Sequence, residues 1–287
     1  MDVIWGVSTN EIAWGGPIAF YLFLAGIAGG AFLTASLTDL FSKNQYPKVI
    51  RSGVLIAIVT IIIGLGLLVV DLGRPLSFWK LLLHVNMGSV MSIGVFIVSG
   101  FTALAVVYGY LIWLGGSAQK RDLQTFRKPV AGLGILFSIG TATYTGFLLS
   151  AVTTNDFWYT PFLGITSVPF LPILFLVSAT STGLAATLIG AWNSGDLTAY
   201  KKVDMVLIIL ELVLISILYL SVHPIFFSGS MAVLFWLGVV GLGLIIPLLI
   251  SFYGITNHKN VVLPVCTMVV IGGLSLRYFV VYTGQLF

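Results

Sequence analysis

The residues best placed to do chemistry in this chain stand where a long apolar segment ends. Residues 54–70 are almost entirely apolar, and Asp71, Arg74 and Pro75 follow directly. A carboxylate at the C-terminal end of a helix faces an unfavourable helix dipole, which favours a cationic partner such as Arg74. One interpretation is that Asp71 and Arg74 line a site for a molecule with a polar head and an apolar tail. The other is a helix stop at a membrane edge, because Pro75 cannot continue a helix and arginine anchors at head groups.

The composition indicates an integral membrane protein. Of the 287 residues, 59% are apolar and only 8% are charged, whereas soluble domains carry roughly 25% charged residues. The formal net charge of +4 reflects where the basic residues stand relative to the membrane, so we expect no nucleic acid partner. No basic stretch precedes the first apolar segment, and residues 1–16 therefore do not resemble a cleaved signal peptide.

Eight segments are long and apolar enough to cross a membrane, for which roughly 20 residues are needed. They cover residues 13–40, 49–70, 87–114, 129–152, 169–192, 203–222, 230–253 and 261–282. We therefore predict an all-α integral membrane protein with eight transmembrane helices. Most Lys and Arg residues stand in or beside the connections that follow the first, third, fifth and seventh spans, and only Arg74 and Lys80 lie on the opposite side. Because basic loops favour the cytoplasm, both termini are predicted to lie outside it.

Three further polar side chains are predicted at the depth of Asp71. Alternating spans bring Tyr21, Ser92 and Tyr144 within roughly 12 Å of the outer surface, at a rise of 1.5 Å per residue. His84 stands in the connection between the second and third spans. Together these groups could bind a polar head between helices. The alternative for the tyrosines is the aromatic belt, where tyrosine is common.

A second group of ionisable residues lies deeper in the predicted spans. Asp204 and Glu211 are seven residues apart and share a helix face, and Arg277 lies within the eighth span. Such groups are costly in a membrane and are usually functional. Together with Asp71 they are candidates for proton transfer, and a structural ion pair is the alternative for Glu211 and Arg277. Asp39 and Asp204 also fit ordinary charges at the membrane boundary.

The two halves of the chain show a faint similarity. Tyr144-Thr145-Gly146 ends the fourth span and Tyr282-Thr283-Gly284 ends the eighth. Four helices per unit would return the chain to the same side, which is the geometry of a parallel repeat. We therefore predict two four-helix bundles, at residues 1–152 and 153–287, with the candidate site in the first.

Redox centres are not expected within this chain. Cys266 is the one cysteine, so no iron–sulfur cluster can be held by the chain's own thiolates. The three histidines, His84, His223 and His258, do not form a pair within the spans, so no haem is predicted. No metal-binding cluster is visible either. Electrons would therefore have to be exchanged with another protein.

Several stretches, taken in order, resemble the NrfD/polysulfide-reductase family of membrane anchor subunits. They are Tyr21-Leu22-Phe23-Leu24-Ala25-Gly26-Ile27-Ala28-Gly29-Gly30-Ala31, Asp71-Leu72-Gly73-Arg74-Pro75 with Phe78-Trp79, Ser89-Val90-Met91-Ser92-Ile93-Gly94, Tyr144-Thr145-Gly146-Phe147-Leu148-Leu149-Ser150, and residues 276–285. The similarity covers nearly the whole chain.

The resemblance implies a subunit of a respiratory complex in the inner membrane of a prokaryote. Such a subunit binds a quinone, either menaquinone or ubiquinone, near the non-cytoplasmic face. It exchanges electrons with a ferredoxin-like [4Fe–4S] subunit, beyond which a molybdopterin catalytic subunit often lies. By position, Tyr144 would hydrogen-bond the quinone and Asp71 would be the carboxylate of the site. Tyr21 stands where the polysulfide reductase anchor has a histidine.

Two other classes of function remain open at the level of sequence. A secondary transporter with a parallel repeat would require broken helices and polar groups near the midplane. An ion-conducting subunit would use Glu211 and Arg277. In that case the quinone site would drive the ion movement. The polar cluster at the outer edge favours the quinone-reactive anchor over the transporter.

Overall fold

The computed structural model describes residues 14–42, 45–71, 86, 88–115, 121–162, 165–257 and 261–286. Over these residues the chain forms seven long continuous helices: α1 (Gly16–Phe41), α2 (Pro47–Asp71), α4 (Val90–Gly115), α5 (Arg121–Ser150), α6 (Leu171–Gly190), α7 (Thr198–Ser221) and α10 (Val262–Leu286). The seventh span is composite, with α8 (Ser230–Val233), the π-helix η3 (Leu234–Ile245) and α9 (Ile246–Thr256) running end to end. Within the described residues, eight helical segments are therefore long and apolar enough to cross a membrane, which confirms the prediction.

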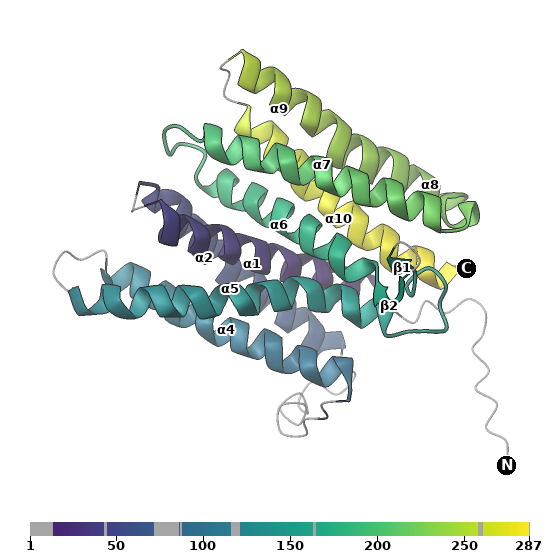
Figure 1. Cartoon of the computed structure of the whole chain (residues 1–287), viewed down its shortest axis with the longest axis horizontal. Coiled ribbons are helices and arrows are strands. Elements are labelled where there is room, and N and C mark those ends of the chain that lie inside the picture. The colour runs from purple at the N-terminus through teal and green to yellow at the C-terminus, as the bar shows by residue number, and fades with distance from the viewer. Residues whose placement is uncertain are drawn as a thin grey trace.

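The helices lie side by side along one direction (Figure 1), with α1 and α6 in the middle, α4 toward one edge and α9 toward the other. α1 packs against α2, α5, α6 and α10, and α6 packs against α7 and α10 as well. The two central helices approach closely because small residues face each other. A Cβ added at Gly30 would lie 1.9 Å from the carbonyl oxygen of Ala179, and in lipid such close contacts replace the hydrophobic effect as the source of helix association.

The division into two four-helix bundles at residue 152 stays a prediction, because α6 contacts α1, α2 and α5 as well as α7 and α10. α4 contacts α5 and α2, whereas η3 contacts α10. Gly243 of η3 and Gly272 of α10 touch, since a Cβ at Gly272 would lie 2.1 Å from the Cα of Gly243. The contact between α1 and α6 joins the two groups of helices.

One end of the helix array holds the start of α1 and the ends of α2, α5 and α10. We call it the Tyr144 end. The backbone N–H of Trp14 donates to Oε1 of Gln285 at 2.7 Å, and Nε2 of Gln285 donates to the Trp14 carbonyl at 3.0 Å. These paired bonds join the residue before α1 to the last turn of α10.

A short hairpin at this end is an addition to the predicted all-α fold. Strands β1 (Pro161–Phe162) and β2 (Ile165–Pro169) pair antiparallel. Two buried aromatic residues precede the hairpin, Phe157 and Trp158, and Nε1 of Trp158 donates to the carbonyl of Val280 at 2.8 Å. The connection between α5 and α6 is therefore packed onto α10.

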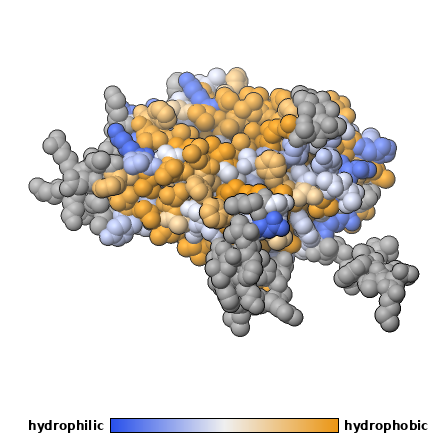
Figure 2. Space-filling view, turned by 60° about the horizontal axis from the view of Figure 1, so that its bottom comes forward, coloured by the Kyte–Doolittle hydropathy of each residue, from blue (hydrophilic) through white to orange (hydrophobic). Residues whose placement is uncertain are grey.

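Apolar side chains cover most of the face shown in Figure 2, and many of the hydrophilic residues lie toward its two ends. This is the distribution expected of a protein whose middle faces lipid. One predicted boundary differs. The fourth span was expected to begin at Pro129, but α5 begins at Arg121 and continues through that proline. Membrane helices tolerate proline when neighbouring helices support the backbone.

Candidate functional site

Two tyrosines are buried between helices at the Tyr144 end. Tyr21 of α1 is 2% exposed and Tyr144 of α5 is 6% exposed, and the two are close enough to interact electrostatically. An aromatic belt would place tyrosine rings at the lipid surface. The burial of both rings therefore argues against the aromatic belt, and their part in a site stays a prediction.

Glycines on the neighbouring helices make room for both rings. A Cβ at Gly94 of α4 would lie 1.8 Å from Cε2 of Tyr144, so the ring occupies the space that any other residue would need. A Cβ at Gly64 of α2 would lie 3.5 Å from Cδ2 of Tyr21, which is ordinary contact. Gly94 therefore sets the position of the Tyr144 ring, and Gly64 merely packs against its neighbour.

Among the described residues, no hydrogen-bond partner is found for the hydroxyl of Tyr21 or of Tyr144. Most buried polar groups in proteins are hydrogen-bonded, and a phenol can both donate and accept. Two buried phenols without a partner in this part of the chain are thus candidates for binding a polar group of a ligand.

An apolar cavity of ≈ 270 Å³ adjoins Tyr144. It lies between α4 and α5 and is lined by Val90, Ile93, Ile97, Gly140, Thr143, Tyr144 and Phe147. The hydroxyl of Thr143 donates to the Ile139 and Gly140 carbonyls, so the phenol is the free polar side chain of this lining. Ile93 and Phe147 are also exposed on the helix surface, and the cavity therefore borders the lipid-facing side.

The remaining predicted site residues are placed only in part. Ser92 stands in the first turn of α4, half-buried, and its Oγ accepts from the Asn86 N–H at 3.3 Å. Asp71 is the last residue of α2. The side chain of Asp71, and the whole of Arg74 and His84, lie outside the described residues, so their part in the site stays a prediction.

The deeper ionisable group is buried completely. Arg277 is 2% exposed, Glu211 4% and Asp204 2%, so Asp204 is not an ordinary boundary charge. Glu211 interacts electrostatically with both Arg277 and Asp204, and Ser178 of α6 lies beside it. The structure therefore brings Arg277 of α10 next to Asp204 and Glu211 of α7 in one buried group beside α6.

The guanidinium of Arg277 has few hydrogen-bond partners, although it is buried. Its Nη2 donates to the Phe175 carbonyl at 3.2 Å, and its Cζ lies 3.8 Å from the centroid of the Phe175 ring. Among the described residues, its Nε and Nη1 have no hydrogen-bond partner, and neither does Oδ1 of Asp204. Buried polar atoms that lack a protein partner are usually hydrogen-bonded to an ordered water molecule.

Asp39 is the residue whose role the sequence did not indicate. Instead of a plain boundary charge, it is an acceptor shared by two other helices at the end opposite Tyr144. Tyr108 of α4 donates to Oδ2 of Asp39 at 2.6 Å, Nε of Arg127 donates to it at 2.7 Å, and Nη2 of Arg127 bonds Oδ1. The only sequence signal was a carboxylate and an arginine near the same membrane edge.

The fold and this site together define a class: an integral membrane protein with eight spans and a partly polar, partly apolar site near one end. Comparison with known proteins gives the family. The family model described as "Polysulphide reductase, NrfD" matches residues 7–287. The chain therefore belongs to the NrfD family.

Three relatives illustrate how far the similarity extends. This protein is 32% identical to a polysulfide reductase chain from Wolinella succinogenes, over 100% of its own length and 99% of the relative. It is 31% identical to the NrfD homolog of Haemophilus influenzae, over 97% and 96%. It is 26% identical to a selenate reductase subunit from Mesobacillus selenatarsenatis, over 95% and 74%.

Proposed function

We propose that this chain is the membrane anchor of a reductase complex and reacts with quinone or quinol. It would exchange electrons between the quinone pool and an iron–sulfur subunit on the non-cytoplasmic side. The observation that carries this proposal is the pair of buried phenols without partners among the described residues, one of which lines an apolar cavity at the lipid-facing side. A quinone has carbonyl acceptors on a flat head and an apolar tail, which is the chemistry that such a site accommodates.

The proposed site residues would suit a quinone at the Tyr144 end in three respects. Each phenol can donate to a carbonyl, or accept from a quinol hydroxyl. Asp71, at the end of α2, would accept a proton released on quinol oxidation, with Arg74 and His84 as further polar neighbours. Ser92 retains its own hydroxyl proton as a donor, because its oxygen acts as the acceptor for Asn86. When bound, the quinone supplies the two-electron redox chemistry that these residues lack.

The relatives support the proposed partners. Two of them are named as components of polysulfide reductase and selenate reductase. By analogy, a ferredoxin-like [4Fe–4S] subunit would contact the Tyr144 end, with a molybdopterin catalytic subunit beyond it. The bacterial relatives support an inner-membrane location, and the distribution of Lys and Arg supports an orientation with the Tyr144 end outside the cytoplasm.

A proton route through Glu211 is the second part of the proposal. Asp204, Glu211 and Arg277 are buried together, and Asp204 lies seven residues closer than Glu211 to the end opposite Tyr144, about 10 Å along the helix axis. α1 would connect this group to the candidate quinone site. Gly26 contacts Arg277, with a Cβ there 3.5 Å from Nη2, and Tyr21 is five residues away, about 7.5 Å along α1.

The proposal is tested by separating quinone chemistry from the rest of the complex. Asp71→Asn keeps the size and polarity of the side chain, and it is expected to lower quinone-linked turnover by about 10²–10⁴-fold, the usual contribution of a positioned acid–base group. Tyr144→Phe is expected to weaken quinone binding by about 0.5–1.5 kcal/mol, the net contribution of one hydrogen bond.

The control is an artificial electron donor that reduces the iron–sulfur subunit directly. Turnover from that donor should be unaffected in both variants, since neither touches the partner subunits. Wild-type quinol turnover in Asp71→Asn would show that Asp71 is only a charge at the end of a helix. Loss of turnover with both donors would point to failed assembly instead of a quinone site.

A further inference from the structure

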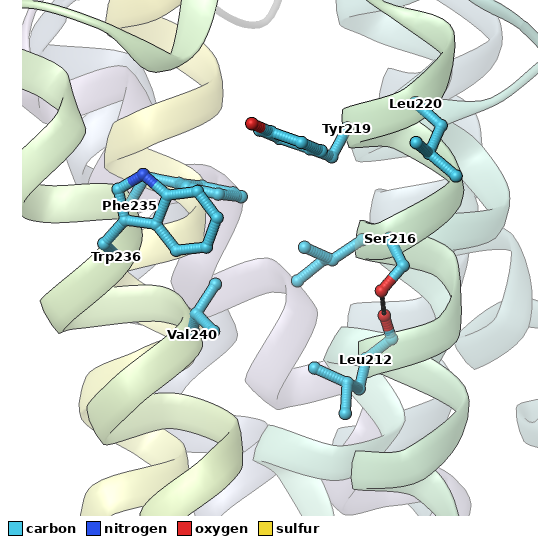
Figure 3. A pocket seen from close by; sticks show the side chains of 8 residues that line it. Leu212, Ser216, Tyr219, Leu220, Phe235, Trp236 and Val240 are labelled. Atoms are coloured by element: carbon cyan, nitrogen blue, oxygen red, sulfur yellow. Dashed lines mark hydrogen bonds between the residues drawn. The ribbon is translucent and has the colours of Figure 1, made fainter.

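A second cavity lies away from the candidate quinone site, between α7 and η3. It measures ≈ 230 Å³. On one side it is lined by Leu212, Ser216 and Tyr219 of α7, with Leu220 near its mouth, and on the other by Phe235 and Trp236 of η3 (Figure 3). None of these residues takes part in the proposed quinone or proton chemistry. We call it the α7–η3 slot.

An aromatic wedge keeps the slot from closing. The ring of Phe227, from the corner between the two helices, lies 4.8 Å from the ring of Tyr219 and 4.7 Å from that of Phe235. It therefore holds the ends of α7 and η3 apart. Well-packed interiors leave few voids, because each void forfeits dispersion contacts. A slot that is propped open on the lipid-facing side is therefore a place where a molecule from the membrane would restore those contacts.

The floor of the slot is suited to hydrocarbon only. The hydroxyl of Ser216 donates to the carbonyl of Leu212 at 2.8 Å, so its proton is already used. The other lining residues at this depth are aliphatic. A buried polar head group without hydrogen bonds is unfavourable, so neither a quinone head nor another polar group would be stable there.

The rim of the slot has a different character. Tyr219 and Trp236 meet edge to face, with ring centroids 5.6 Å apart, and in Figure 3 the Tyr219 hydroxyl lies across the slot, on the η3 side. Among the described residues, neither the phenol hydroxyl nor the indole N–H has a hydrogen-bond partner. Tyrosine and tryptophan at this depth are suited to the ester and phosphate region of a bilayer.

The dimensions correspond to a single acyl chain. Leu212 and Leu220 are eight residues apart, which is about 12 Å along the helix axis and roughly parallel to the membrane normal. The volume is below the ≈ 300–1,000 Å³ of pockets that enclose a whole drug-sized ligand. The slot is also continuous with the lipid-facing surface, since Leu220 is 83% exposed and Leu237, next to Trp236, is 65% exposed.

We propose that the α7–η3 slot binds one acyl chain of a membrane phospholipid, with the head-group end held at the Tyr219–Trp236 rim. Such a lipid would remain with the protein when the surrounding bilayer is removed. It would also join α7 to η3 where the protein itself leaves a gap. This proposal is independent of the candidate quinone site, whose cavity lies between α4 and α5.

The test is lipid retention by the purified complex. The complex is washed in mild detergent, and bound phospholipid is counted by native mass spectrometry and by phosphorus analysis. Ser216→Phe places a ring in the slot and should remove one retained phospholipid per complex. Val213→Phe is the matched control, because Val213 lies on the same helix, is exposed and does not line the slot. It should keep that lipid.

The outcomes distinguish the occupants. An equal phospholipid count in the parent, Ser216→Phe and Val213→Phe complexes would overturn the proposal. Loss of an isoprenoid quinone instead of a phospholipid would also overturn it, by assigning the slot to a quinone tail. If Ser216→Phe fails to assemble, Ser216→Leu fills the slot with a smaller side chain. Trp236→Phe keeps an aromatic ring but removes the indole N–H, and it should release the lipid at lower detergent concentration.

Discussion

Gly94→Ala should disable the quinone site without removing any of its polar groups. The added Cβ would lie 1.8 Å from Cε2 and 1.9 Å from Cζ of Tyr144, whereas ordinary contact between carbon atoms begins near 3.5 Å. The ring must therefore shift by about 1.5 Å or more, because the helix backbone at Gly94 has little freedom to retreat. Inserting a methyl group into a packed site costs about 1–3 kcal/mol.

The shift also moves the phenol hydroxyl away from the position it would share with a ligand. A misplacement of about 1 Å can lower a rate by roughly 10²-fold. Gly94→Ala is therefore expected to reduce quinol-linked turnover at least as much as Tyr144→Phe does. The assay is steady-state turnover with quinol, followed in the assembled complex, with the artificial donor as the reference for intact partner subunits.

Two comparisons make this prediction specific. Gly132→Ala, on the same helix as Tyr144, is the control, because a Cβ at Gly132 meets nothing within 4 Å. It should leave turnover unchanged and slightly stabilise the helix. In a Tyr144→Phe background, Gly94→Ala should lower turnover by a smaller factor than it does alone, since the hydroxyl is already absent. If Gly94→Ala alone keeps wild-type turnover, the Tyr144 ring does not act in the reaction.

Three further substitutions test other parts of the structure. Arg127→Gln should lower the free energy of unfolding by about 1.5–3 kcal/mol, because Asp39 loses its charged hydrogen bonds. Thermal unfolding in detergent measures this effect. An unchanged melting temperature would contradict the role of Asp39 as a shared acceptor. Glu211→Gln should reduce proton movement in proteoliposomes more than quinone binding, and an unaltered proton yield per electron would leave Glu211 as a structural charge. Gly30→Val should prevent folding or assembly, because a Cβ there meets the Ala179 carbonyl oxygen at 1.9 Å; normal yield of the assembled complex would refute the close packing of α1 on α6.

Much of the fold followed from the sequence alone. In a membrane, backbone polar groups must be hydrogen-bonded within the protein, so only helices and closed barrels can cross it. A run of about 20 apolar residues therefore predicts a transmembrane helix without knowledge of its neighbours. For this reason all eight spans were predictable, with the largest difference at the start of the fourth helix, which lies at Arg121 instead of Pro129. The depth of Tyr21 and Tyr144 in the membrane stays a prediction. The family was also recognisable from short motifs in the right order, and the match over residues 7–287 confirms it.

Which side of each helix faces protein was decided only by the tertiary structure. When a helix is apolar on nearly all sides, its sequence does not indicate which side packs against other helices and which side faces lipid. The sequence therefore could not tell whether Tyr21 and Tyr144 belong to an aromatic belt or to a buried site, nor that Gly94 makes room for a ring. The same limit applies to Asp39, whose partner Arg127 lies 88 residues away. Both the site and this ion pair depend on distances between helices, and only packing sets those distances.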